Sequence, residues 1–400
     1  MSLSQVSDLS LTKSESSALL PRTSTTLLCD ATPALPCTQL ASTLMSLLCL
    51  SGTDVARVTS DFSPEVLQTL MGRVFSVLTS GGNAERPAAY TPHRIVLPTQ
   101  NHTALFMPAR IAQPITLRGT SVKVVCVPTS PTDLRGLPAS TLVLDEDTGA
   151  VKAILNAANL TALRNAAGSL LSTNLVGPRE PSSLVAFGAG AQIKEHLLLH
   201  LRAFPSIQTC TIVNRTINDR ASQLATLVRT RFPAVRVTCI ANDATAPSAH
   251  PALKDAVLSA NLVICATSST VPLFPSAWVA DGTHVVLVGS FKPTMHEVDS
   301  ALVRRAVAAH RLVVDSRAAC LAEAGELIAA GVAGSEVVEI GALVAFDAAG
   351  ELRLPPGPPA STRPVTIFKS VGVGLQDVAI ACAVVQKAEA MGIGRYVDWA

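Results

Sequence analysis

A short glycine-rich turn at residues 188–192 is the part of this sequence whose residue types most clearly indicate chemistry. It joins an apolar run at 183–187 to a segment with helical spacing that starts near Ile193. A strand, a glycine turn and a helix in this order direct backbone N–H groups and the positive helix end at an anion, usually a dinucleotide pyrophosphate. A tight turn without a ligand is the plainer interpretation, and Ile193 is larger than the residue usual at its position. The residues predicted to hold the cofactor here are Gly188, Gly190, Ala191 and Gln192.

A second apolar run, at 209–213, bears on which dinucleotide would bind. In the usual fingerprint an acidic residue ends this strand and binds the ribose 2′-hydroxyl. No carboxylate follows here, whereas the guanidinium of Arg215 and the hydroxyl of Thr216 suit the oxygens of a 2′-phosphate. The sequence therefore predicts NADPH (NADP) in preference to NADH; in the alternative interpretation Arg215 is a solvated loop residue. The predicted cofactor contacts in this loop are Asn214, Arg215 and Thr216.

Both loops lie in a segment where apolar runs alternate with helical stretches, for example at 217–232 and 298–308. Such alternation implies parallel strands joined by right-handed crossovers. The predicted fold class is therefore α/β, with a Rossmann-type doubly wound parallel sheet. The predicted strands of this sheet are 184–187, 209–213, 235–240, 262–266, 284–289 and 311–315.

The N-terminal half shows shorter apolar runs separated by Pro, Gly, Asn and Thr, which predict an antiparallel or mixed sheet. Helical spacing predicts three further helices, over 61–78, 159–175 and about 374–391. The first would have Ser63 as its N-cap and Pro64 in its first turn. Its apolar positions, expected to face the core, are Val66, Leu67, Leu70, Val74 and Val77. The predicted strands of the N-terminal sheet are 94–97, 103–107, 121–127 and 140–145.

Composition narrows the functional classes. A chain of 400 residues with 48% hydrophobic residues predicts two domains with sizeable cores. Only 15% of the residues are charged and the net charge is +2, which argues against a nucleic-acid partner. No apolar run approaches the roughly 20 residues of a membrane span, and no secretory signal is apparent, so a cytoplasmic protein is expected. The nine cysteines form no CxxC pair, which predicts reduced thiols, no disulfide framework and no metal site.

Several separated motifs resemble those of the ornithine cyclodeaminase/mu-crystallin family, in the family's order and over about residues 47–395. The block at 366–377 is the most distinctive, because generic dinucleotide-binding enzymes do not carry it. The motifs are HRIVLP at 93–98, MPA at 107–109, VKVV at 122–125, LTALRNAA at 160–167, GAGAQ at 188–192, VNRT at 213–216, THVVLVGSFKP at 283–293, VDSR at 314–317, AEAGEL at 322–327 and TIFKSVGVGLQD at 366–377.

The resemblance implies a homodimer with two domains in each chain. Residues 46–160 together with 350–400 would form an α+β domain that binds the substrate and makes the dimer contact. Residues 161–349 would form the NAD(P)-binding Rossmann domain, and residues 1–45 an N-terminal extension.

The resemblance also implies roles for three basic residues. Arg94 and Arg164 match arginines that hold the carboxylate of the substrate, and an arginine–carboxylate pair supplies both charge and orientation. Lys123 matches a lysine of the same pocket that can bind the carboxylate or donate a proton. Without the resemblance each would be interpreted as a surface or salt-bridged residue, and His102, in the same region, as structural. The residues implied to bind substrate are Arg94, Met107, Lys123, Arg164 and Phe291, the three basic ones also serving catalysis.

Phe291 marks a departure from the cyclodeaminases, which carry an aspartate at this place. A phenyl ring can neither accept a proton nor pair with an ammonium group. The GSFKP sequence at 289–293 is more similar to the reductase and dehydrogenase branch, and it implies an apolar pocket beside the nicotinamide. The residues implied to lie near the nicotinamide are Ala266, Thr267, Ser268, Gly289 and Ser290.

The expected function is an NADPH-dependent reductase of a C=N bond next to a carboxylate, that is, a cyclic ketimine or imino acid reductase. Lys123, or else an ordered water, would supply the proton that the imine needs. Three alternatives stay open: an ornithine or lysine cyclodeaminase, an amino-acid dehydrogenase, and a non-catalytic NADPH-dependent protein that binds a small carboxylated ligand.

Overall fold

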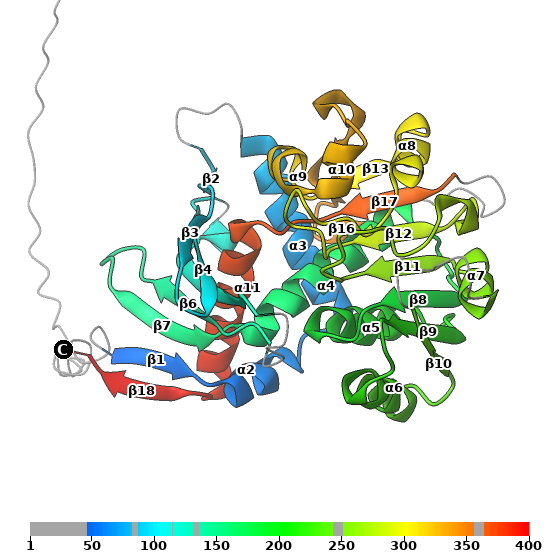
Figure 1. The fold of residues 1–400 in the computed structure, drawn as a ribbon. Coiled ribbons are helices and arrows are strands. Elements are labelled where there is room, and N and C mark those ends of the chain that lie inside the picture. The colour runs from blue at the N-terminus through cyan, green and yellow to red at the C-terminus, as the bar shows by residue number, and fades with distance from the viewer. Residues whose placement is uncertain are drawn as a thin grey trace, which may run out of the picture. The chain divides into compact units, whose positions relative to one another are not determined.

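Two sheets organise the part of the chain that the structure, a computed structural model, describes (Figure 1). The described residues are 46–81, 87–113, 115–130, 136–242, 251–355 and 364–399. Residues 45–400 form one compact unit. The predicted N-terminal extension therefore lies outside the described residues.

The first sheet, called the parallel sheet here, has the order β10-β9-β8-β11-β12-β17-β13-β14, and every neighbouring pair is parallel. Its central strands are continuous apolar runs because both faces are buried. Along β8, Leu184 and Ala186 belong to one hydrophobic cluster, whereas Val185 and Phe187 belong to another on the opposite face. The strands are β8 (Ser183–Phe187), β9 (Thr209–Asn214), β10 (Arg236–Ala241), β11 (Leu262–Cys265), β12 (His284–Leu287), β13 (Leu312–Val314), β14 (Val338–Glu339) and β17 (Thr366–Lys369).

Helices cover both faces of the parallel sheet, which confirms the predicted doubly wound α/β arrangement. Helices α4, α5 and α6 contribute to the cluster on one face, and α7 to α10 to the cluster on the other. Side chains cap several of them: Asn218 accepts from Ala221 N–H at the start of α6, and Asp299 accepts from Leu302 N–H at the start of α8. These helices are α4 (Ala158–Val176), α5 (Ala191–Ala203), α6 (Asp219–Arg231), α7 (Pro251–Leu258), α8 (Ser300–Ala308), α9 (Arg317–Glu323) and α10 (Gly325–Ala329).

The second sheet, called the mixed sheet, has the order β18-β1-β7-β6-β5-β4-β2, with β3 also paired to β4. Only β1 and β7 are parallel; the other pairs are antiparallel, as a mixed sheet was predicted to be. Its strands are β1 (Ser46–Leu50), β2 (Ala89–Tyr90), β3 (Ile95–Pro98), β4 (His102–Ile111), β5 (Gly119–Pro128), β6 (Ala139–Leu144), β7 (Val151–Asn156) and β18 (Arg395–Asp398). A small hairpin joins β15 (Ala345–Phe346) to β16 (Leu352–Arg353).

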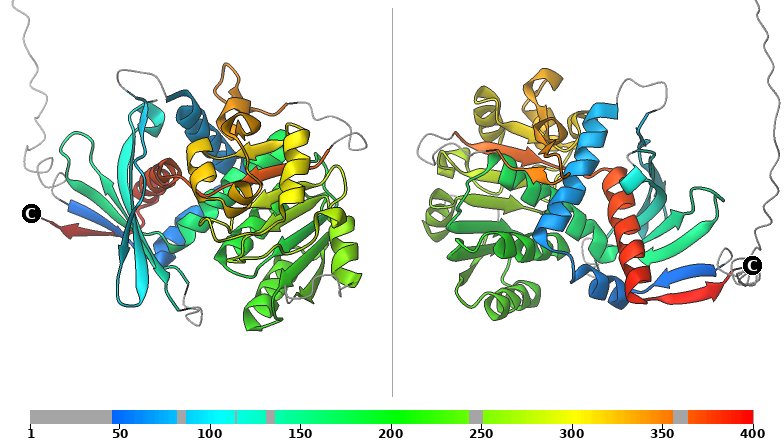
Figure 2. Two further views of the ribbon diagram at one scale, coloured as in Figure 1. Left: turned by 45° about the horizontal axis from the view of Figure 1, so that its top comes forward. Right: turned by 180° about the vertical axis from the view of Figure 1, so that it is seen from behind.

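Three helices pack with the mixed sheet: α2 (Gly52–Thr59), α3 (Pro64–Ser80) and α11 (Gly374–Met391). Figure 2 shows α11 lying along the mixed sheet and beside α3. Ser63 caps α3 and Pro64 opens it, as predicted. The expectation that Val66 faces the core is wrong: its side chain is 54% exposed, because it sits on the first turn of α3 on the side away from Leu67 and Met71.

The parallel sheet holds a strand that the sequence pattern did not predict there. Strand β17, from the C-terminal part of the chain, lies between β12 and β13. The predicted division placed all of residues 350–400 with the substrate-binding domain, and this assignment is wrong for β17. The run before α11 therefore joins the two sheets, since β17 ends in one and α11 packs on the other.

The structure also describes most of the cysteines and all helices of the described residues. The described cysteines, at 49, 126, 210, 239, 265, 320 and 382, are all free thiols, whereas Cys29 and Cys37 lie outside the described residues. Among the described helices, none has both the length and the apolar character needed to cross a membrane.

Candidate functional site

The glycine turn between β8 and α5 has the geometry that the sequence predicted. Gly188 has a φ of +113°, a conformation that residues with a side chain rarely adopt. A Cβ there would lie 3.1 Å from the carbonyl oxygen of Ala266 and 3.3 Å from Cγ1 of Ile193. The buried Ile193 packs beneath the turn, and α5 still begins at Ala191, so the larger residue neither opens the turn nor shifts the helix.

The start of α5 fits a bound pyrophosphate. Gly190 is its N-cap residue, no side chain caps the helix, and a Cβ on Gly190 would have open space around it. An uncapped helix start presents N–H groups and a positive dipole end to a ligand. A pocket of about 350 Å³ opens beside this turn, and its lining includes Gly190, Lys194 and Arg220.

The loop after β9 places Arg215 and Thr216 at the carboxyl end of the strand next to β8, with both residues exposed. Asn214 shapes this loop, since its Nδ2 donates to the carbonyl oxygen of Thr216 at 2.8 Å. The three predicted residues therefore lie at the same sheet edge as the glycine turn.

The loops after β11 and β12 meet through one buried carboxylate. Glu297 Oε1 accepts from Thr267 N–H at 2.7 Å, and Glu297 Oε2 accepts from Gly289 N–H at 2.7 Å. A Cβ on Gly289 would collide with the backbone of Thr267, so only glycine fits. Ser290 donates to the carbonyl oxygen of Met295 at 2.7 Å. This arrangement brings together the five residues predicted near the nicotinamide, Ala266, Thr267, Ser268, Gly289 and Ser290.

Three buried charges form the centre of the other half of the site. Lys123, on β5, places its Nζ 2.7 Å from Asp377 Oδ2, and Arg164, on α4, places its Nε 3.1 Å from Asp377 Oδ1. Each of the three side chains is at most 3% exposed. Arg164 also donates from Nη1 to Gln376 Oε1 at 2.9 Å. Lys123 and Arg164 are thus brought together as predicted, through a carboxylate of α11.

Burial and charge set the protonation of this cluster. Burial lowers the pKa of Lys123 to about 8, against the attraction of the Asp377 carboxylate and with the help of the nearby Arg164 charge. Burial alone would raise the pKa of Asp377, but Arg164 and Lys123 outweigh it, so that this pKa is lowered. At neutral pH the three groups therefore carry a net charge of +1 in a buried place, which favours a bound anion.

Asn165 links the cluster to the glycine turn. Its Oδ1 accepts from Arg164 Nη1, and its Nδ2 donates to Gln192 Oε1 at 3.3 Å. The basic cluster of the mixed sheet and the predicted cofactor turn of the parallel sheet therefore belong to one site.

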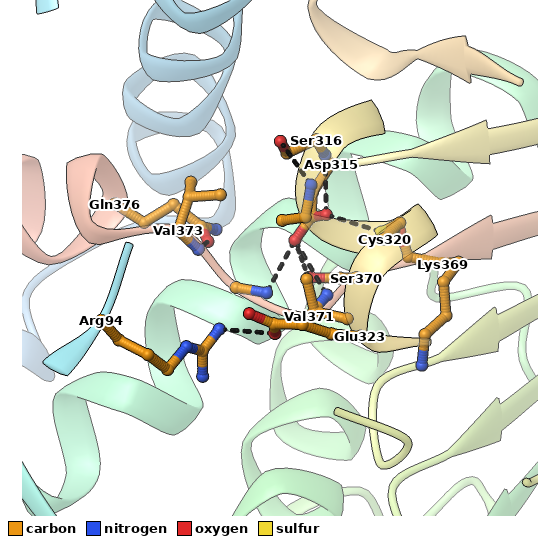
Figure 3. Close-up of polar contacts among 12 residues, drawn as sticks. Arg94, Asp315, Ser316, Cys320, Glu323, Lys369, Ser370, Val371, Val373 and Gln376 are labelled. Carbon is orange, nitrogen blue, oxygen red and sulfur yellow. Dashed lines mark hydrogen bonds and ion pairs between the residues drawn. The ribbon is translucent and has the colours of Figure 1, made fainter. Parts of the chain in front are cut away.

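Arg94 lies next to this cluster in the more open part of the site. Its Nη2 is 2.8 Å from Oε2 of Glu323, the last residue of α9, and the two side chains are 18% and 21% exposed (Figure 3). Burial raises the pKa of Glu323, while the Arg94 charge opposes that rise. The guanidinium predicted to hold a substrate carboxylate therefore pairs with a carboxylate of the protein.

The remaining predicted residues are placed as follows. Met107 is buried and stands opposite Lys123 in the β4–β5 pairing. Phe291 is half-buried, and the centroid of its ring lies 5.6 Å from Lys292 Nζ. His102 begins β4, five residues from Met107, and is thus about 16 Å along the strand from the Lys123 level, which places it away from the cluster.

Sequence reasoning missed the carboxylates of the site. Asp377 holds Lys123 and Arg164, Glu323 holds Arg94, and Glu297 holds two loops of the parallel sheet. The first two lie inside motifs that had been singled out, at 366–377 and 322–327, so the signal was present. A charged residue inside a distinctive block is a candidate ion-pair partner for the basic residues of the same site.

Comparisons with known proteins find relatives over most of the chain. The sequence model of the ornithine cyclodeaminase/mu-crystallin family matches residues 63–392. The ketimine reductase mu-crystallin of Mus musculus is 30% identical over 293 residues, covering 72% of this chain and 82% of the mouse protein. A Delta(1)-pyrroline-2-carboxylate reductase of Bacillus thuringiensis subsp. konkukian is 28% identical over 326 residues, covering 79% of this chain and 91% of the bacterial one.

Solved structures share the fold. The Thermococcus litoralis Delta(1)-pyrroline-2-carboxylate reductase, in complex with NADH and L-proline, has a TM-score of 0.72 and 24% identity, covering 88% of this chain and 100% of that chain. The iminosuccinate reductase of Paracoccus denitrificans, in complex with NAD+, has a TM-score of 0.70 and 24% identity, covering 88% of this chain and 99% of that chain.

Proposed function

The chain belongs to the ornithine cyclodeaminase/mu-crystallin family, and from this premise we propose that it is a nicotinamide-dependent reductase of cyclic ketimine acids. The observation that carries the proposal is the buried cluster of Lys123, Arg164 and Asp377, which has a net positive charge. Asn165, the residue after Arg164, connects this cluster to the glycine turn through its hydrogen bond to Gln192. A reductase of this class needs both elements together: a place for the substrate's carboxylate and a nicotinamide within hydride reach. The curated relatives named as ketimine and pyrroline-2-carboxylate reductases support the same substrate class.

Arg94 and Arg164 hold the carboxylate of the imino acid in this proposal. Arg164 is fixed by Asp377 and Gln376, so its guanidinium loses little freedom on binding. Arg94 exchanges its present partner, Glu323, for the carboxylate of the substrate. The two arginines orient the imine carbon toward the loops after β11 and β12, where the nicotinamide is expected.

The reduction needs a hydride and a proton. The nicotinamide, when bound, supplies the hydride. Lys123 supplies the proton to the imine nitrogen, since burial has lowered its pKa to about 8 and an ammonium group of that pKa is a good acid at neutral pH. Phe291 contributes an apolar surface beside the loops after β11 and β12 and offers no base for amine chemistry.

The preferred cofactor in this proposal is NADPH. Arg215 and Thr216 stand at the end of β9, where NAD-specific sites carry an acidic residue. Lys194 and Arg220, which line the neighbouring pocket, add positive charge for a 2′-phosphate.

We also propose a homodimer. Strand β3 is exposed along its whole length, with Ile95, Val96 and Leu97 at 62%, 56% and 51% exposure. An apolar strand of this kind on a sheet is typical of a surface that another chain covers. Mass measurement by native mass spectrometry tests it, and a monomeric mass at micromolar concentration would contradict it.

One panel of reactions tests the function. Purified protein is mixed with NADPH or NADH and with pyrroline-2-carboxylate, its six-membered homologue, or pyruvate with methylamine, and loss of cofactor absorbance is followed. We expect turnover with the cyclic imines and a preference for NADPH. Ammonia release from ornithine or lysine without net cofactor change would instead indicate a cyclodeaminase, and tight binding without turnover a binding protein.

A further inference from the structure

One buried carboxylate holds the segment 370–372, between β17 and α11, through hydrogen bonds. Asp315, at the end of β13, accepts through Oδ2 from Ser370 Oγ at 2.6 Å, from Val371 N–H at 3.0 Å and from Gly372 N–H at 2.7 Å (Figure 3). Its Oδ1 accepts from Ser316 N–H at 2.7 Å. Asp315 is fully buried, so these bonds are not in competition with water.

This segment in turn lies directly against the guanidinium of Arg164. Gly372 has a φ of +80°, and a Cβ built on it would lie 2.5 Å from Arg164 Nη1 and 3.1 Å from Arg164 Cζ. The backbone of Gly372 therefore packs directly against the guanidinium group of Arg164. A shift of this backbone would change the position of that group.

The other contacts of Arg164 start from the same place in the chain. Gln376 and Asp377, on the first turn of α11, accept from its Nη1 and Nε, and Gln376 Oε1 also accepts from Val373 N–H at 3.2 Å. Asp315 anchors the beginning of this frame from the parallel sheet, because β13 and β17 are neighbours and their carboxyl ends meet at one edge.

We propose that Asp315 is a positioning residue for substrate binding, which holds Gly372 against Arg164 and so sets the place of the substrate's carboxylate. The inference rests on the proposed function, since it takes Arg164 as a carboxylate ligand. It assigns to Asp315 no contact with substrate or cofactor. Its effect should fall on the KM for the imino acid and spare the affinity for NADPH, because the glycine turn has no bond to Asp315 among the described residues.

Two independent variants test the inference. Asp315→Asn keeps the size but replaces one of the two carboxylate oxygens by an amide N–H group. Both oxygens accept from backbone N–H groups, so in either orientation a donor meets a donor and the anchor of the 370–372 segment is weakened. Gly372→Ala leaves Asp315 intact and pushes a methyl group onto Arg164. We expect each to raise the KM for the cyclic imine at least about tenfold, while the Kd for NADPH changes less than about twofold.

Asp299→Asn is the matched control. Asp299 also accepts from two backbone N–H groups, those of Ser276 and Leu302, but it caps α8 and has no bond to the 370–372 segment. We expect its KM to equal that of the wild type. Hydrogen exchange of the amides at 371 and 372, followed by mass spectrometry, should accelerate in Asp315→Asn and not in the control.

The outcomes distinguish a failure of the positioning role of Asp315 from a failure of the proposed function. If the wild type reduces the imine and both variants keep its KM, the positioning role is wrong. If the KM rises and the NADPH affinity falls together in both variants, Asp315 supports the whole fold and the assignment is also wrong. If the wild type does not turn over, the proposed function fails, and amide exchange still decides whether Asp315 fixes Gly372.

Discussion

Arg94 Nη2 lies 2.8 Å from Glu323 Oε2, so the arginine predicted to hold the substrate already holds a carboxylate of the protein. The two residues come from different halves of the site, since Arg94 precedes β3 of the mixed sheet and Glu323 ends α9 beside the parallel sheet. A substrate carboxylate that binds Arg94 has to displace Glu323. The ion pair is therefore an internal competitor of the substrate.

Removing Arg94 should raise the KM for the imino acid, whereas weakening Glu323 should lower it. Arg94→Ala removes a charged hydrogen-bond donor, which is worth about 1.5–3 kcal/mol, so we expect the KM for the imino acid to rise about tenfold or more. Glu323→Gln weakens the competitor, so we expect the KM to fall severalfold. Steady-state kinetics with saturating NADPH measure both.

Arg118→Ala is the control for this pair. Arg118 also belongs to the mixed-sheet half and pairs with Glu146 and Asp147, but it is 38% exposed and has no contact with the cluster. Its KM should match that of the wild type. Unchanged kinetics in Arg94→Ala would remove Arg94 from the substrate site.

Arg215→Ala tests the preference for NADPH. The loss of a guanidinium beside a 2′-phosphate should weaken NADPH at least about tenfold and NADH less than about twofold. Fluorescence titration of the free protein with each cofactor gives the two dissociation constants. Arg231→Ala, at the exposed far end of α6, serves as the control, and equal losses of both cofactors in Arg215→Ala would show that Arg215 does not read the phosphate.

The pH profile reports on Lys123. Its ammonium form is the proton donor, and its pKa is about 8, so the active form is lost as pH rises through that value. We expect kcat/KM for imine reduction to be level below about pH 7 and to fall toward tenfold per pH unit above about pH 8.5. Rates measured in overlapping buffers, with NADPH affinity checked at each pH, give the profile.

Two variants connect this limb to its residue. Lys123→Met should abolish the limb together with most of the activity, whereas Lys152→Met, which breaks the exposed pair with Glu389, should leave the limb in place. A limb that persists at the same pH in the residual activity of Lys123→Met would assign the proton to another group.

The sequence was sufficient for the parts of the fold with strong local signals. The glycine turn at 188–192, the cap at Ser63 and the helix at 374–391 depend on neighbouring residues, and each lies where it was predicted. The place of β17 could not be predicted, because a strand of four residues with only Ile367 and Phe368 apolar gives no information on which of two sheets it joins. Its partners, β12 and β13, are decided by long-range packing.

The candidate site divides in the same way. Basic residues such as Lys123 and Arg164 were found through motifs, but their partner Asp377 is more than 200 positions away from either in the chain, and only the structure pairs them. The role of Gly372 was equally hidden, since its positive φ and its contact with Arg164 are properties of the folded chain.

Three buried histidines should make the protein sensitive to mild acid. His196, His200 and His284 are fully buried, and burial lowers their pKa values to about 4, about 3 and about 3. Each bonds a hydroxyl of α4, for example His200 Nε2 to Thr173 Oγ1 at 3.2 Å. The unfolded chain binds their protons below about pH 6.5 and the folded chain does not, so stability is lost as pH falls from there.

The expected loss is about 1.4 kcal/mol per pH unit for each histidine, between about pH 6 and pH 4.5. Urea unfolding followed by circular dichroism at several pH values gives the slope, and with it the number of protons taken up. His200→Gln should reduce that number by about one, whatever its stability at neutral pH. His310→Asn, at an exposed position, is the matched control and should leave the number of protons unchanged. An unchanged slope in His200→Gln would contradict the prediction, because it would mean that His200 is already protonated in the folded protein. A protonated His200 would keep its bonds to Thr173 and to the carbonyl oxygen of His196, at 2.8 Å, but its charge would be buried without a counter-ion.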